Sequence, residues 1–419
     1  MRTIRKNKHF FMAGGLGVAA FSVFYFFIPT FFSVGYSVDD PKDDNKTASF
    51  SVKGDVKPVS KEPEFVVTHV KVPEAVKSIY MTACVASMPS FRDKLVKIAD
   101  TTEVNSIIID VKDFSGTIAF VATDPLTKDT VGTGCRVKDL REFIATLHEK
   151  GIYVIARITV FQDPYYTKAH PELAVHKKSD GTVWKDRKGL SFVDVSAKPF
   201  WDYIVAIGKE SYALGFDELN FDYMRFPSDG DMKNIEYSWG KGMAKAEALE
   251  HFFAYLHNAL KDTGAKLSVD LFGMTATNTD DLNIGQVLER ALPYFDYIAP
   301  MVYPSHYPTG FNGYKNPNDH AYDIVQFSMK RAGDRAEATT TTVEHFGGVR
   351  VGTSTPAVYT KEVYSRNKLR PWLQDFDYGG DYDAAKVRAQ IQATYDADMN
   401  SWFLWDPKNL YTKEALKAQ

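Results

Sequence analysis

The sequence predicts a (β/α)8 barrel, a fold in which eight parallel strands alternate with helices around a closed sheet. Short, mostly uninterrupted runs of β-branched and aromatic residues are typical of strands buried on both faces. These runs alternate with longer segments whose apolar residues recur at helical spacing, and about eight such repeats close into a barrel. An open doubly wound sheet is the alternative, but MTACVASMPS follows the first strand where a Gly-rich phosphate loop would be expected.

Each element can be placed along the chain. The expected strands are residues 77–82, 106–112, 152–161, 216–226, 266–273, 294–303, 370–376 and 401–407. The expected helices are residues 91–100, 137–150, 198–214, 243–263, 281–291, 321–333 and 383–398. Glycines in EKGIYV, LGFDEL and TGAKLS stand just before strands, where helix C-caps belong. Two stretches exceed ordinary loop length: 162–197 after the third strand, and 304–320 with its continuation 336–370 around the sixth and seventh strands. Long loops after barrel strands lie on the C-terminal face of the barrel, where barrel active sites form.

The composition limits the class of protein. Of 419 residues, 44% are hydrophobic and 25% are charged, and the net charge of −3 gives no basic patch, so we expect no nucleic-acid partner. The two cysteines, Cys84 and Cys135, show no metal-binding spacing. They could form a disulfide in an exported chain, or remain as two thiols. We expect no metal and no cofactor.

The N-terminus has the pattern of a membrane anchor. Four basic residues lie within the first eight positions, and residues 10–36 contain no charge, which exceeds the ~20 residues needed to cross a bilayer as a helix. A cleaved signal peptide is the alternative, but its apolar stretch is shorter and ends in a small-residue cleavage site. We therefore expect residues 1–36 to be a cytoplasmic flank and an uncleaved signal-anchor, 37–75 a polar linker, and 76–419 a barrel outside the cytoplasm of a single-pass cell-membrane protein.

Carboxylates gather at the expected strand ends, where a barrel places its catalytic groups. Glu218, Asn220 and Asp222 share one face of the fourth strand, which must be the barrel interior because the alternating residues are apolar. Charge there is costly unless it is paired or functional, and Arg225 is near enough in sequence to pair with a carboxylate. Asp270 lies on the next strand, so Asp222 and Asp270 are candidates for the two carboxyl groups of a glycosidase.

Other polar and aromatic residues at strand ends are candidates to bind substrate, since rings can stack on sugars and polar groups can bond hydroxyls. A carboxylate in such a place can instead cap a helix, and a lone histidine is often structural. Asp375 ends the seventh strand and is a further catalytic candidate. The expected substrate-binding residues are Asp110, Lys112, Arg157, Tyr223, Arg225, Tyr303, His306, Trp372 and Trp405.

Three segments together resemble a bacterial family of glycoside hydrolases formerly described as a domain of unknown function. They are VNSIIIDVKDFSGTIAF, GIYVIARITVFQDP and LGFDELNFDYMRFPSDG, and the resemblance runs from about residue 76 to 407. It implies a TIM barrel related to α-amylase-type enzymes, with Asp222 as nucleophile, Asp270 as acid and Asp375 as third carboxylate. The sequence departs from the amylase pattern in having Asp rather than Glu on the fifth strand and in lacking the Asn-His ending of the third, so Glu218 is a second candidate for the acid.

The predicted function is therefore hydrolysis of glycosidic bonds in a polysaccharide of the cell wall, a capsule or another extracytoplasmic material. A second hypothesis is a carbohydrate-binding or scaffold protein on a barrel without catalysis. A lyase or a deacetylase in the same cleft is a third, although a lyase would favour a strongly basic cleft. The fold alone would not separate these.

Overall fold

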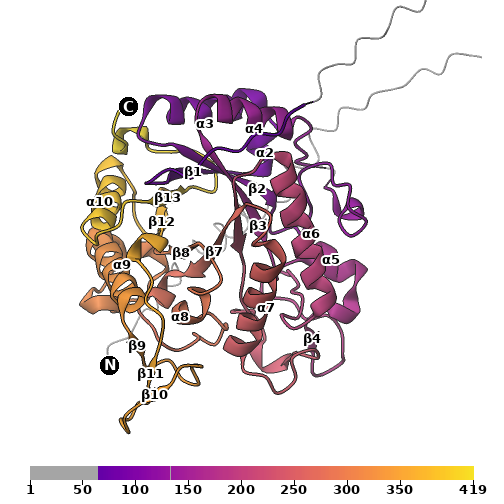
Figure 1. The fold of residues 1–419 in the computed structure, drawn as a ribbon, viewed down its shortest axis with the longest axis vertical. Coiled ribbons are helices and arrows are strands. Elements are labelled where there is room, and N and C mark those ends of the chain that lie inside the picture. The colour runs from indigo at the N-terminus through magenta and orange to yellow at the C-terminus, as the bar shows by residue number, and fades with distance from the viewer. Residues whose placement is uncertain (1–64, 133) are drawn as a thin grey trace, which may run out of the picture. The chain divides into compact units, whose positions relative to one another are not determined.

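A computed structural model describes residues 65–132 and 134–419, which contain a closed barrel of eight parallel strands (Figure 1). Each strand pairs with the next one along the chain, and the last pairs with the first. All eight predicted strands are confirmed. The barrel strands are β1 (Lys77–Met81), β2 (Ser106–Lys112), β3 (Tyr153–Thr159), β5 (Glu218–Asp222), β7 (Lys266–Phe272), β8 (Tyr297–Met301), β12 (Trp372–Gln374) and β13 (Trp402–Trp405).

Helices surround the barrel on the outside (Figure 1). They are α2 (Ala83–Ala86), α3 (Pro89–Thr101), α4 (Leu140–Glu149), α5 (Pro164–Ala169), α6 (Lys198–Leu214), α7 (Lys245–Leu260), α8 (Leu288–Ala291), α9 (Ala321–Glu337) and α10 (Ala384–Tyr395). The predicted helix at 281–291 is largely wrong, since only α8 is helical. Leu282, Asn283 and Gly285 all have positive φ, which a right-handed helix does not allow.

Two apolar cores follow from the alternation of side chains along the strands. The larger core lies between the strands and the helices and includes Leu219, Phe221, Val269 and Leu271. The smaller core fills the barrel interior with mainly aromatic and branched side chains, among them Tyr153. A filled interior leaves space for a ligand only at the end of the barrel.

The long loops carry small elements of their own. β4 (His176–Lys177) and β6 (Ile235–Glu236) join the loops after β3 and β5 in an antiparallel pair. β9 (Thr340–Thr341), β10 (Arg350–Val351) and β11 (Val358–Thr360) form a small antiparallel sheet after α9. The long loop after β3 also contains the short helix α5.

Residues 65–75, which the composition places in the linker, pack against the N-terminal end of the barrel. The Val70 amide donates a hydrogen bond to Asp217 just before β5, at 2.8 Å, and Val70 and Val72 contact the interior core. The predicted membrane segment at 10–36 lies outside the described residues. Within 65–132 and 134–419, no helix is long and apolar enough to cross a bilayer.

Cys84 and Cys135 form a disulfide, with their Cα atoms 4.4 Å apart. Of the two alternatives that the sequence left open, the structure therefore has the paired one. The bond ties α2, directly after β1, to the loop that leads from β2 to α4. Both segments follow barrel strands, so the cross-link braces the end of the barrel at which an active site is expected.

Candidate active site

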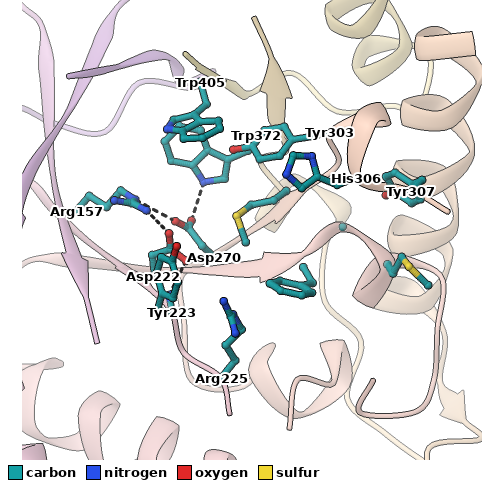
Figure 2. Close-up of a pocket in the computed structure, with 14 residues that line it drawn as sticks. Arg157, Asp222, Tyr223, Arg225, Asp270, Tyr303, His306, Tyr307, Trp372 and Trp405 are labelled. Atoms are coloured by element: carbon teal, nitrogen blue, oxygen red, sulfur yellow. Dashed lines mark hydrogen bonds and ion pairs between the residues drawn. The ribbon is translucent and has the colours of Figure 1, made fainter. Parts of the chain in front are cut away.

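A cavity of about 310 Å³ opens at the C-terminal end of the barrel strands (Figure 2). Its walls combine carboxylates, two arginines and several aromatic rings. It is lined by Arg157, Asp222, Tyr223, Arg225, Asp270, Phe272, Gly273, Met274, Met301, Tyr303, His306, Tyr307, Trp372 and Trp405. A concave apolar pocket with a few convergent polar groups is the usual form of a small-ligand site.

Asp222 is the last residue of β5, and both of its carboxylate oxygens are bonded. Its Oδ2 forms an ion pair with Nη2 of Arg157, and its Oδ1 accepts a hydrogen bond from the Tyr223 amide at 2.5 Å. Tyr223 has a φ of 52°, an uncommon left-handed conformation for a tyrosine, and this turns the chain sharply after the strand. Two donors to one carboxylate favour its charged form.

Asp270 lies beside Asp222 on β7, in a contrasting environment (Figure 2). Its Oδ1 accepts hydrogen bonds from Nε1 of Trp372 at 2.7 Å and Nδ2 of Asn220 at 2.8 Å, whereas its Oδ2 has no hydrogen-bond partner among the described residues. The side chain is 1% exposed. Burial, and then the negative charge of Asp222, raise the pKa of Asp270 well above its usual value, although Arg157 opposes the shift. The raised pKa favours the protonated form of Asp270, whereas the ion pair with Arg157 favours the charged form of Asp222.

Arg157, on β3, is the cation that joins these groups. Besides Asp222, its guanidinium contacts Asp110 on β2 through Nη1 at 2.7 Å, and its Nε lies 3.8 Å from Oδ2 of Asp270. Asp110 also accepts a hydrogen bond from the Tyr80 hydroxyl. Burial raises the pKa of Asp110 to about 6, so Asp110 is mostly ionised at neutral pH. The prediction that Arg225 pairs with a carboxylate is wrong, because Arg157 takes that role from the neighbouring strand.

The opposite wall of the cavity is aromatic. Trp405 and Tyr303 stack with ring centroids 5.5 Å apart, and Phe376 contacts both rings edge-on. His306 continues this wall and contacts Tyr378, which is 63% exposed. Burial lowers the pKa of His306, which favours its neutral form. The rings thus extend from the carboxylates to the surface, and they offer flat apolar faces to a ligand.

The comparisons with known proteins show the family to which the chain belongs. A family model described as "Putative glycosyl hydrolase domain" matches residues 78–411. The chain belongs to this glycosyl hydrolase family. A search of the curated proteins found no match.

Two solved structures are similar to the chain. The PgaB (BpsB) glycoside hydrolase domain from Bordetella bronchiseptica is 12% identical, with 82% of this chain and 99% of that chain covered and a TM-score of 0.55, which shows a shared fold. A hypothetical protein from Ruminiclostridium thermocellum is 30% identical over 46% of this chain and 96% of that chain, with a TM-score of 0.42.

Gly273, three residues after Asp270, shows how closely the ends of β7 and β8 approach each other. A Cβ at this position would lie 2.4 Å from the carbonyl oxygen of Met301 and 2.8 Å from the Tyr307 hydroxyl. Glycine thus lets the chain after β7 pass directly against the chain after β8. The cavity floor beside Asp270 depends on this contact.

Three residues predicted for the site have structural roles instead. Glu218, the second candidate for the acid, is the first residue of β5 and forms a buried ion pair with Arg370 at 2.9 Å and a hydrogen bond with Tyr153 at 3.0 Å. Alternation put Glu218 on the same face as Asp222, but it lies four residues, ~13 Å, further down the barrel. Lys112 likewise turns away from the cavity.

Lys112 and Asp163 form an ion pair at 2.8 Å in which neither side chain is exposed. The Lys112 ammonium also donates to the Thr159 carbonyl at 2.6 Å. Asp375 does not line the cavity either: its Oδ2 accepts a hydrogen bond from the Thr412 amide at 3.0 Å. Burial raises the pKa of Asp375 to about 7. The amylase-like third carboxylate therefore has a structural environment here.

The remaining predicted residues fall into two groups. Asp110 lies behind Arg157 and does not line the cavity. The residues that do line it are Arg157, Tyr223, Arg225, Tyr303, His306, Trp372 and Trp405. The sequence did not point to Phe272, Met274, Met301 and Tyr307, which also line it. Phe272 is the last residue of the strand that carries Asp270, and Met274 comes two residues after it; that position was the signal available. In the described part of the chain, no group of three or more His, Cys, Asp or Glu residues is placed to hold a metal ion.

Proposed function

We propose that this glycosidase cleaves an extracytoplasmic polysaccharide, with Asp270 as general acid and Asp222 as nucleophile or general base. The observation that carries the proposal is the contrast between the two carboxylates. Asp222 is ion-paired with Arg157, while Asp270 is buried with a raised pKa and one oxygen that has no hydrogen-bond partner. Two carboxyl groups with separate protonation states are what glycoside hydrolysis requires.

The steps follow from these states. The Asp270 carboxyl donates its proton to the glycosidic oxygen as the bond from that oxygen to the anomeric carbon breaks. Asp222 either attacks the anomeric carbon, forming a glycosyl ester that water later hydrolyses, or removes a proton from the water that attacks. In the first case Asp270, now ionised, accepts a proton from the water that hydrolyses the glycosyl ester.

Arg157 serves both groups. Its ion pair keeps Asp222 charged, and its Nε, 3.8 Å from Oδ2 of Asp270, is placed to stabilise the carboxylate that forms when the proton leaves. Trp405 and Tyr303 of the aromatic wall, together with Trp372, offer flat surfaces on which the apolar face of a sugar ring can stack.

The N-terminal sequence supports a location at the cell membrane. A basic flank before the uncharged run at 10–36 predicts a signal-anchor with the barrel outside the cytoplasm. A cell-wall or capsular polysaccharide would then be within reach of the enzyme. Recovery of the full chain in the membrane fraction, with the barrel open to protease added outside the cell, is the expected result.

The test of the proposed activity is release of reducing sugar from a panel of bacterial cell-wall, capsular and storage polysaccharides. The full chain in detergent would be compared with Asp222→Asn, Asp270→Asn and the matched control Asp262→Asn, whose side chain is exposed at the other end of the barrel. We expect one polysaccharide to be hydrolysed by the parent and the control, and at least about 100-fold more slowly by the two site variants. Retention of a polysaccharide by all four proteins without hydrolysis would instead indicate a binding protein.

A further inference from the structure

Arg225 is a second cation in the cavity, and its environment differs from that of Arg157. Its guanidinium lies over the rings of Tyr223 and Phe272, 4.9 and 4.8 Å from their centroids. Among the residues that the structure describes, Arg225 forms hydrogen bonds through Nη1 alone, to the Ser228 hydroxyl at 3.0 Å and the Phe226 carbonyl at 3.3 Å. Within residues 65–132 and 134–419, no carboxylate oxygen lies within 4 Å of Arg225, whereas three carboxylates surround Arg157.

Arg225 is half-buried, and a cation that loses part of its contact with water is costly unless an anion compensates it. Burial lowers the pKa of Arg225, in keeping with this cost. The negative charges of Asp222, Asp229 and Asp186 act on Arg225 only from beyond ion-pair distance, and Asp222 is itself paired with Arg157. The compensating anion is therefore expected to come with the ligand.

Figure 2 shows where such an anion would lie. Arg225 points from below toward the space in front of Asp270, while Trp405, Trp372 and Tyr303 close the cavity from above. A sugar ring stacked on the aromatic wall would thus direct the substituents of its other side toward Arg225.

We propose that Arg225 binds an acidic substituent of the substrate, so that the polysaccharide carries a carboxylate on the sugar held in this cavity, as in a uronic acid. The inference rests on the proposed function and names its substrate class. The free edge of a guanidinium presents parallel N–H donors that match the two oxygens of a carboxylate. The two rings hold the guanidinium in place, which reduces the entropy lost when the anion binds.

Binding can be measured without turnover in an Asp270→Asn background, because asparagine is close in shape and charge to the protonated Asp270. Full-length protein in detergent would be titrated calorimetrically with oligosaccharides of polygalacturonate, alginate and hyaluronate, and with the carboxyl-reduced form of each. We expect at least one acidic oligosaccharide to bind about 10- to 100-fold more tightly than its reduced form, the range for charge-assisted hydrogen bonds.

The same titrations in three further variants locate the effect. Arg225→Met should abolish the preference for the acidic form, and Arg225→Lys, which keeps the charge but not the planar donors, should retain part of it. Arg331→Met is the matched control, since Arg331 is exposed on α9 and has no ion pair in the described chain, and it should keep the full preference. Thermal unfolding of each variant would confirm that it is folded.

The inference is overturned if acidic and reduced forms bind equally, if no acidic oligosaccharide binds, or if the preference survives in Arg225→Met. Tighter, Arg225-dependent binding of glucose 6-phosphate than of any uronate would overturn the carboxylate assignment in favour of a phosphorylated sugar. Hydrolysis of a neutral polysaccharide without any acidic preference would leave the proposed function standing and remove this inference. Arg225-dependent binding of an acidic oligosaccharide without hydrolysis of any polysaccharide would support the acidic site and count against the proposed hydrolysis.

Discussion

Asp375 offers a quantitative test of how the barrel handles a buried carboxyl group. The side chain is 4% exposed at the end of β12. Oδ2 accepts one hydrogen bond from the Thr412 amide, and Oδ1 has no partner in the described chain. Burial, with a further contribution from the negative charges of Asp406 and Asp377, raises its pKa from 3.8 to about 7.

The sign of the effect follows from linkage. Between pH 4 and 7 the folded protein binds the proton more tightly than the unfolded chain, so the stability that protonation contributes is lost as the pH rises toward 7. The folded-state pKa of Asp375 lies about three units above the unfolded value, and about two of these units lie above pH 5. Each unit corresponds to about 1.4 kcal/mol, so ionisation of Asp375 should lower the free energy of unfolding by about 3 kcal/mol between pH 5 and 8.

The perturbation is Asp375→Asn, which keeps an acceptor for the Thr412 amide but cannot ionise. Urea unfolding of the parent and the variant at pH 5 and pH 8 gives the difference, and the titrations of groups that do not interact with Asp375 cancel in the comparison. We expect the variant to gain about 3 kcal/mol relative to the parent on going from pH 5 to pH 8. A relative gain below about 1 kcal/mol would refute the reasoning.

Three other changes test the structural assignments. Lys112→Met should destabilise the protein by about 3 to 5 kcal/mol because it leaves Asp163 buried and unpaired, and Lys112→Met with Asp163→Asn should recover most of that loss in urea unfolding. Glu218→Gln should lower stability by a similar amount, because its buried arginine partner loses its counter-charge. Activity per folded molecule should stay at the parent level. A loss of turnover without a loss of stability would instead indicate that Glu218 is catalytic. Replacing Cys84 and Cys135 by Ser removes a disulfide between residues 51 positions apart, and we expect it to lower the free energy of unfolding by about 3 to 4 kcal/mol. The variant should have a lower midpoint of thermal unfolding, and reductant should not lower that midpoint further.

The barrel could be predicted from the sequence because its strands are buried on both faces and so appear as continuous apolar runs such as SIIIDVK. The face of each polar side chain was also predictable, since Glu218 and Asp222 alternate with apolar neighbours. The depth of each of these residues along the barrel axis was not predictable. Period-two alternation repeats at every level, so it cannot separate a residue at the bottom of a strand from one at its catalytic end.

The cation of the site could not be assigned from one sequence either. Arg157 stands opposite Asp110 on one side and Asn220 on the other, which lets it reach Asp222 two residues further on. That register between parallel strands depends on how the barrel closes, and no local pattern encodes it. Arg225 was the nearer candidate in sequence, but the left-handed turn at Tyr223 directs it to the other side of the cavity.

The central claim is that Asp270 gives a proton to the leaving oxygen and that Asp222 acts at the anomeric carbon. Once the released sugar is known, its 2,4-dinitrophenyl glycoside needs no acid, because the leaving group departs as a stable anion. We predict that Asp270→Asn slows polysaccharide hydrolysis by about 10²- to 10⁴-fold but slows cleavage of the aryl glycoside far less, whereas Asp222→Asn abolishes both. Equal losses on the two substrates in Asp270→Asn, or undiminished cleavage of either in Asp222→Asn, would contradict the assignment.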